Sequence, residues 1–175
     1  MKKYTALLLS ACLLSSASLA QVSGDRRLPF VVEADTASYS DITQTSVFTG
    51  RVILTQGTTR IEADKIETIV DPGGYQFATA SMTGGGLVRF QQQRAGSNEV
   101  IKAKGRQVIY DGKQNLVVLS QNAQMRRLSP SGRLIDQIDG DELVYNQLTE
   151  IFESRVIPGA SGRTRVIVTP NSQAK

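Results

Sequence analysis

A short hydrophobic pattern recurs four times along this chain, and it sets the strongest limit on the fold. In its second copy, Ile61 and Ala63 alternate with polar residues, and the alternation resumes out of step at Ile66. Alternation with a period of two predicts a β-strand with one buried face, and the shift predicts a bulge or a corner. The copies are Val32-Ala34-Ala37-Tyr39, Ile61-Ala63-Ile66-Thr68, Ile138-Gly140-Leu143-Tyr145 and, with two more residues in the middle, Ile101-Ala103-Val108-Tyr110. Repeats of one short unit indicate stacked strands with a continuous core.

The second copy is expected to pair with the segment before it. Residues 47–54 alternate in the same way, and Gly57 lies in the short connection to residues 60–70, so the two segments predict an antiparallel hairpin. The sizes and polarities of residues 47–54 recur at residues 118–125. An amphipathic helix over residues 60–70 is the alternative, because Ile66, Ile69 and Val70 also fit helical spacing.

Turn-forming residues divide the remainder into many short segments of strand character. We expect further strands at residues 75–80, 87–90, 99–110, 116–126, 133–145, 148–156 and 165–169, a polar loop at residues 91–98, and no secure helix. A single sheet of about a dozen strands must curl or fold over on itself. The sequence therefore predicts an all-β protein, either a jelly roll or a stacked β-roll.

The N-terminus has the features of a secretory signal. Lys2 and Lys3 precede an apolar run over residues 4–14, and Ser18-Leu19-Ala20 supplies small residues for cleavage after Ala20. Residues 9–12 also fit a lipoprotein cleavage box, which would leave a lipid on Cys12. We expect a signal peptide at residues 1–20 and a flexible leader at 21–29. A single domain at 30–170 and a disordered tail at 171–175 would follow.

Composition excludes several kinds of chemistry. The chain has no histidine, and its one cysteine, Cys12, lies in the expected signal, so disulfides, the usual zinc sites and a Ser-His-Asp triad are excluded from the exported part. The net charge is +4, and Lys2 and Lys3 contribute two of these charges. A charge this small is far from the strongly basic character of nucleic-acid-binding domains. We expect no metal, no cofactor and no nucleic-acid partner.

Two groups of charged residues are candidates for a functional site. Asp35, Asp64 and Asp141 occupy equivalent positions of the repeat on the expected outer face, where solvated structural carboxylates are a better interpretation than catalytic ones. Lys102, Lys104 and Arg106 form a basic row on one outer face. This row either contacts phosphate or, as is more common, discourages strand pairing at an edge.

No constellation for catalysis is left, so the inner apolar face is the candidate functional surface. A sealed core is the simplest interpretation of such a face. However, there is no tryptophan, and small residues recur on the inner face, which leaves room for a ligand. The expected contributors are Phe30, Val32, Phe48, Val52, Leu54, Ile61, Phe90, Tyr110, Leu116 and Leu119.

Residues 47–57 and 61–65 strongly resemble the signature of the OstA-like family of lipopolysaccharide export proteins. The similarity extends through residues 71–74, Tyr110, and residues 117–123, 138–141 and 166–170, which covers nearly all of the exported chain. The resemblance implies a twisted, slightly open β-jellyroll whose interior groove holds the acyl chains of lipid A. It implies a periplasmic, non-enzymatic transport protein of a Gram-negative bacterium, with Phe30 and Val32 at the groove mouth and Phe90 and Tyr110 further in.

The same resemblance implies partners that join edge to edge. LptC at the inner membrane is expected to dock on Phe30, Val31, Val32 and Glu33. The next copy of the chain, in head-to-tail association, or LptD at the outer membrane would dock on Arg165, Val166, Ile167 and Val168. Two alternatives are an LptC-like partner that retains an N-terminal anchor, and a structural or hydrolytic β-roll with a sealed core.

Overall fold

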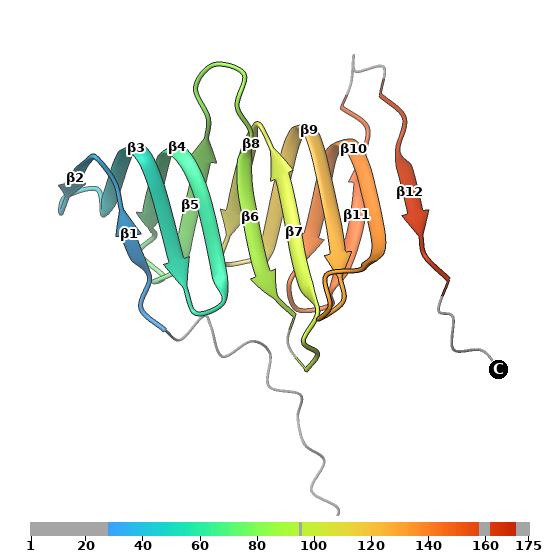
Figure 1. The fold of residues 1–175 in the computed structure, drawn as a ribbon. Coiled ribbons are helices and arrows are strands. Elements are labelled where there is room, and N and C mark those ends of the chain that lie inside the picture. The colour runs from blue at the N-terminus through green and yellow to red at the C-terminus, as the bar shows by residue number, and fades with distance from the viewer. Residues whose placement is uncertain (1–27, 95, 158–161, 171–175) are drawn as a thin grey trace, which may run out of the picture.

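The computed structural model describes residues 28–94, 96–157 and 162–170, and within them the only regular elements are antiparallel strands (Figure 1). The expected signal peptide, Cys12, most of the leader and the tail lie outside the described residues. The strands are β1 (Val31–Glu33), β2 (Thr36–Ser40), β3 (Thr45–Gln56), β4 (Thr59–Val70), β5 (Gln76–Ser81), β6 (Val88–Gln93), β7 (Val100–Gly105), β8 (Gln107–Asp111), β9 (Leu116–Leu128), β10 (Leu134–Asn146), β11 (Ile151–Arg155) and β12 (Arg165–Val168).

The pairing of these strands builds two layers from one sheet. Layer 1 contains β1, β6, β7 and β12 with residues 52–56, 59–63, 123–128 and 134–140 of the long strands. Layer 2 contains β2, β5, β8 and β11 with residues 45–49, 65–70, 116–120 and 142–146. Figure 1 shows the long strands bending over from one layer to the other. The result is the predicted all-β jelly roll, with its long strands each bent into two short segments.

The bends of the long strands lie along one side of the molecule, and we name this row of bends the spine. In β3, Gly50 and Arg51 both have positive φ angles and together face the single residue Asp64 of β4. In β9, Gln121 and Asn122 also have positive φ angles and face Asp141 of β10. Two residues opposite one define a β-bulge, which bends the strand. The similarity between residues 47–54 and 118–125 is therefore confirmed as one bulge used twice.

Each repeat of the hydrophobic pattern straddles this spine. The first two apolar positions of every copy lie in layer 1 and the last two lie in layer 2, as Ile61, Ala63 and Ile66 illustrate in β4. The shift in alternation marks the corner, which turns both apolar sets inward in the copies after the first; in the first copy Ala37 and Tyr39 are exposed. The helical alternative for residues 60–70 is wrong, because β4 pairs with β3 along its length and with β5 and β6 on its other side.

Two of the three repeat aspartates, Asp35 and Asp64, stabilise the spine through local contacts, whereas Asp141 Oδ2 is buried without a hydrogen-bond partner among the described residues. Asp35 pairs with Arg51 at 2.5 Å, while Asp64 Oδ2 accepts hydrogen bonds from the Thr83 hydroxyl at 2.6 Å and the Thr83 backbone N–H at 2.9 Å. These bonds lower the pKa values of Asp35 and Asp64 below the usual 3.8. Thr83 lies in the connection that crosses from layer 2 to layer 1, so Asp64 fixes that crossing to the corner.

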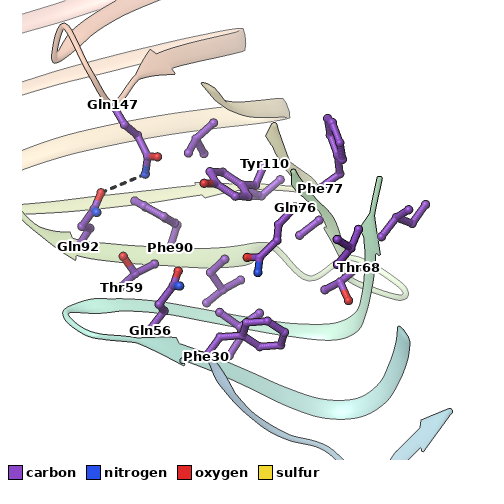
Figure 2. A pocket seen from close by; sticks show the side chains of 17 residues that line it. Phe30, Gln56, Thr59, Thr68, Gln76, Phe77, Phe90, Gln92, Tyr110 and Gln147 are labelled. Carbon is purple, nitrogen blue, oxygen red and sulfur yellow. Dashed lines mark hydrogen bonds between the residues drawn. The ribbon is translucent and has the colours of Figure 1, made fainter. Parts of the chain in front are cut away.

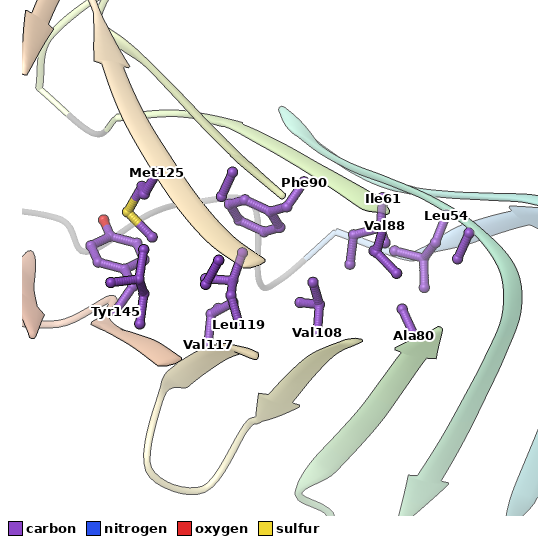
Figure 3. Packing of buried hydrophobic residues seen from close by; sticks show 14 of the residues in the cluster. Leu54, Ile61, Ala80, Val88, Phe90, Val108, Val117, Leu119, Met125 and Tyr145 are labelled. Carbon is purple, nitrogen blue, oxygen red and sulfur yellow. The ribbon is translucent and has the colours of Figure 1, made fainter. Parts of the chain in front are cut away.

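The interior of the C-terminal half is filled by side chains. Leu119 and Leu143 are fully buried, Ile101 is 1% exposed, and the rings of Tyr145 and Phe152 stack with centroids 4.2 Å apart. Figure 3 shows this cluster continuing between the layers toward Leu54 and Ile61. Burying an aliphatic or aromatic side chain of this kind stabilises the fold by about 1.5–3 kcal/mol, so this cluster contributes substantially to stability.

The sheet ends in edge strands at both ends of the molecule. Within the described chain, β1 and β2 pair only with β3, and β11 and β12 pair only with β10. One expectation about strand boundaries is corrected here: β6 continues to Gln93 instead of ending at Phe90, so the polar loop is shorter and Gln92 faces inward with Val88 and Phe90. Across the described residues, no helix is long and apolar enough to cross a membrane.

Candidate functional site

A pocket opens between the two layers in the N-terminal half, on the side away from the spine. Its cavity volume is about 80 Å³, and it is open to solvent at the mouth. Layer 1 contributes β3, β4 and β6, and layer 2 contributes β4, β5, β8 and β9 with Gln147 just after β10, so the pocket spans the space between the layers (Figure 2). The lining residues are Phe30, Leu54, Gln56, Thr59, Ile61, Thr68, Ile69, Val70, Gln76, Phe77, Ala78, Phe90, Gln92, Val108, Tyr110, Val117 and Gln147.

The pocket wall is apolar and its rim carries neutral amides. None of the lining residues is charged, and the polar ones are chiefly glutamines, including Gln56, Gln76 and Gln92. Gln92 is only 7% exposed, and the side-chain amide of Gln147 donates to its carbonyl oxygen across 3.5 Å, from layer 2 to layer 1. Such a wall suits an apolar chain, and the amides supply hydrogen bonds where that chain meets water.

The structure brings some of the predicted groove residues together around this pocket. Phe30, at 39% exposed, lies at the mouth, and Leu54, Ile61, Phe90 and Tyr110 also line the pocket. Val52 and Leu119 are buried in the core, and Val32 and Phe48 pack against that core outside the pocket.

Leu116 is not on the inner face. Val117 and Leu119 are buried at 2% and 0% exposure, and successive residues of a strand point to opposite faces. Leu116 therefore has the outward parity, and Val117 takes the inner position that the sequence analysis gave to Leu116.

Several lining residues were missed. Phe77 and Ala78 belong to β5, a strand with little apolar alternation beyond them, and the assignment of residues 91–98 to a loop concealed Gln92. Val108 could have been found, because it precedes Tyr110 in the third copy of the repeat and shares its parity. Thr68 could have been found in the same way, as the last position of the second copy of the repeat, whereas Gln76 and Gln147 carry no sequence signal for an apolar pocket.

Charged side chains close the mouth in the C-terminal half. Arg94, just after β6 in layer 1, donates from Nε at 2.8 Å to Glu150, which lies between β10 and β11 in layer 2. Arg94 also pairs with Glu99 at 3.0 Å, and Arg127 connects Glu99 to Asp136. The hydrogen bond to Glu150 is the main reason why the pKa of Arg94 lies above its usual range. This network separates the open pocket from the filled half.

The two expected docking edges lie at opposite ends of the sheet. Val31 is 60% exposed on β1, and Val166 and Val168 are 59% and 72% exposed on β12. Thr169, just after β12, donates its backbone N–H to Ile135 at 2.8 Å. Because hydrogen-bonded and non-hydrogen-bonded pairs alternate in antiparallel strands, the N–H groups of Val166 and Val168 point away from β10.

Comparison with known proteins shows what the chain resembles. The family described as "LptA/(LptD N-terminal domain) LPS transport protein" matches residues 31–151. Lipopolysaccharide export system protein LptH of Pseudomonas aeruginosa is 29% identical over 172 residues, covering 95% of this chain and 93% of LptH. Lipopolysaccharide export system protein LptA of Escherichia coli K12 is 30% identical over 139 residues, covering 79% of this chain and 71% of LptA.

A solved structure has the same fold. The crystal structure of LptH from Pseudomonas aeruginosa, described as the LptA-homologous periplasmic component of the lipopolysaccharide transport device, superimposes with a TM-score of 0.73 at 25% identity. The match covers 85% of this chain and all of that chain.

Proposed function

This chain belongs to the LptA/(LptD N-terminal domain) family of LPS transport proteins, and we propose that it carries lipopolysaccharide between the inner and outer membranes. The acyl chains of lipid A occupy the groove between layers 1 and 2, and the sugars remain in water. No catalysis is required for this role, so the protein acts as a carrier and not as an enzyme. It works without a cofactor or a metal.

The pocket between the layers carries this proposal. Its uncharged, largely apolar wall is continuous with the hydrophobic interior, and its mouth is open on the side away from the spine. Moving one methylene from water into such a wall gains about 0.8 kcal/mol. A lipid with several acyl chains therefore gains far more from this groove than from any single polar contact.

The groove-lining residues follow from this placement. Phe30 stands at the mouth, Leu54, Ile61 and Phe90 form the layer 1 wall, and Tyr110 with Val117 forms the layer 2 wall. The narrow pocket accommodates a short apolar segment, and longer acyl chains require the layers to separate along the mouth. The remaining candidates, Val32, Phe48, Val52 and Leu119, would contact lipid only in such a separated state, whereas Leu116 is withdrawn.

The free edges support a bridge of joined sheets. LptC docks on β1 through residues 30–33, and β12 adds to the edge strand of the next copy or of LptD through residues 165–168. Each junction is an antiparallel strand addition that continues layer 1. The exposed Val166 and Val168 supply apolar contact beside outward-pointing N–H groups, which is the chemistry that strand addition uses.

Export to the periplasm follows from cleavage after Ala20. N-terminal sequencing of the protein from a Gram-negative envelope should begin at Gln21. Retention of residues 1–20 in a membrane-anchored form would instead identify an LptC-like partner of the same fold.

A pocket-filling substitution tests the lipid site. Ala78 lines the pocket from β5, and its neighbour Thr79 on the same strand does not. Ala78→Phe should weaken lipopolysaccharide binding by about tenfold, equivalent to ~1.4 kcal/mol, and Thr79→Phe should leave it near the wild-type value. Equal binding by both folded variants would show that lipopolysaccharide does not enter this pocket.

A further inference from the structure

Five cationic side chains gather on the outer face of layer 1, on the opposite side of the sheet from the lipid pocket. We name this group the basic ladder, and it consists of Arg60 on β4, Arg89 on β6, Lys102 and Lys104 on β7, and Arg126 on β9. All five residues are exposed.

The register of the strands places like charges directly opposite each other. Arg89 pairs across the β6–β7 ladder with Lys104, and Lys102 pairs across the β7–β9 ladder with Arg126. Like charges at directly opposed positions destabilise a sheet. The fold therefore holds these cations together against their mutual repulsion.

Neighbouring carboxylates neutralise only one end of the ladder. Glu62 accepts from Arg60 at 3.0 Å and from Arg89 at 3.5 Å. Asp139, beyond β9, is engaged by the amides of Gln124 at 2.6 Å and Gln137 at 2.7 Å.

The other end of the ladder keeps its charge. Arg126 bonds the neutral Gln137 at 2.8 Å. Among the described residues, no acidic side chain forms an ion pair with Lys102, Lys104 or Arg126.

Protection of a sheet edge does not explain these charges. The sequence analysis gave that as the more common reason for the row of Lys102 and Lys104, but β7 pairs with β6 on one side and with β9 on the other. Arg106, the third residue of that row, lies beyond β7 at the spine, where its backbone N–H donates to Ser120 and Gln121. The two lysines instead stand in the middle of layer 1.

The ladder surrounds a hollow in this face. The hollow has a volume of about 400 Å³ and is lined by the four strands that carry the ladder, together with the amides of Gln91 and Gln124. The hollow is open to solvent and is large enough for a compact ligand. A planar bilayer surface does not enter a hollow of this size, and a folded protein would need a much larger contact area.

We propose that the hollow binds the phosphate groups of a phosphorylated saccharide. The guanidinium fork of Arg126 matches phosphate oxygens, and Lys102 and Lys104 add compact positive charge beside it. Gln91 and Gln124 provide donors and acceptors for sugar hydroxyls. Bound phosphate also removes the repulsion within the two like-charged pairs. This site is separate from the proposed lipid groove and does not depend on it.

Calorimetric titration of the full chain with fructose 1,6-bisphosphate tests the proposal. We expect saturable binding at low salt that weakens as salt is raised, and a loss of at least tenfold in the double variant Lys102→Gln/Lys104→Gln. The control Lys65→Gln/Lys113→Gln removes the same charge from sites outside the ladder and should bind like the wild type. Far-UV circular dichroism verifies that both variants are folded.

Three outcomes would overturn the proposal. These are no binding by the folded wild type, equal weakening in the two double variants, and ladder-dependent binding to phosphatidylglycerol vesicles without binding to the bisphosphate. The last of these would assign the face to a membrane surface instead.

Discussion

Arg94 in layer 1 and Glu150 in layer 2 form an ion pair across the mouth of the jelly roll, 56 positions apart in sequence. This contact joins the two layers on the side opposite the spine, where the chain itself does not connect them. On one side of it lies the open pocket, and on the other side lies the filled core around Leu119 and Leu143. The pair thus marks where the groove changes from open to closed.

A double-mutant cycle should reveal this contact as a real coupling between the layers. Arg94→Gln and Glu150→Gln should couple by about 1–2 kcal/mol in the free energy of unfolding, because both side chains are largely shielded from water. The exposed pair Arg155–Glu153, 3.7 Å apart on β11, is the control and should couple by about 0–0.5 kcal/mol. Urea unfolding measures both cycles, and equal couplings would mean that the mouth is not held by Arg94.

The bulge at Gly50 should not tolerate substitution by a residue with a side chain. Gly50 has a φ of +81°, and a Cβ there would approach the Asp35 Cβ at 2.8 Å. Gly50→Ala should destabilise the fold by about 2–4 kcal/mol. Gly132 also has a φ of +81° but faces open space, so Gly132→Ala should cost only the backbone strain, about 1–2 kcal/mol. Thermal unfolding of the two variants compares the costs, and a similar loss in both would show that the Asp35 contact is unimportant.

Acid should weaken the crossing loop that Asp64 holds. The hydrogen bonds from Thr83 lower the pKa of Asp64 below its usual 3.8, so the unfolded chain takes up this proton at a higher pH than the folded one. The stabilisation is complete well above pH 3.8 and is lost as the pH falls through the lowered pKa. Asp64→Asn should therefore lose less stability than the wild type between pH 6 and pH 2, as measured by urea unfolding at each pH. Parallel profiles for the two proteins would contradict this.

The free edge of β12 should be blocked by proline. The N–H of Val166 points away from β10, so Val166→Pro removes a donor from the outer edge while preserving the ladder to β10. We expect end-to-end association to fall by at least tenfold in analytical ultracentrifugation, with thermal stability little changed. Val166→Thr keeps the N–H and is the matched control. If both variants associate like the wild type, β12 is not the docking edge.

The strand pattern and the corners were accessible from sequence because they depend on local alternation. The shift between Ala63 and Ile66 located the spine, and the similarity between residues 47–54 and 118–125 located its two bulges. Both are properties of a single strand and its direct partner. The family resemblance, now established by comparison, supplied the expectation of an open groove that alternation alone left undecided.

The boundaries of the pocket could not be predicted from the sequence, because they depend on which parts of the interior are filled by side chains. Val52 and Leu119 have the same inward alternation as Leu54 and Ile61, yet the first two are sealed and the second two line open space. The difference follows from position along the strand, because Val52 and Leu119 lie next to the two bulges at the spine, whereas Leu54 and Ile61 lie nearer the mouth. Leu116 was misplaced for a simpler reason, since two residues three positions apart in a regular strand cannot share a face.

Photo-crosslinking inside and outside the groove tests the central claim most directly. Tyr110 lines the pocket, and its neighbour Ile109 is 38% exposed with the opposite parity on β8. A photoreactive phenylalanine at each position, in cells that make lipopolysaccharide, separates the two faces of one strand. We predict lipopolysaccharide adducts at position 110 and none at position 109. Adducts at position 109 alone, or at neither position in a folded and exported protein, would contradict an interior lipid groove.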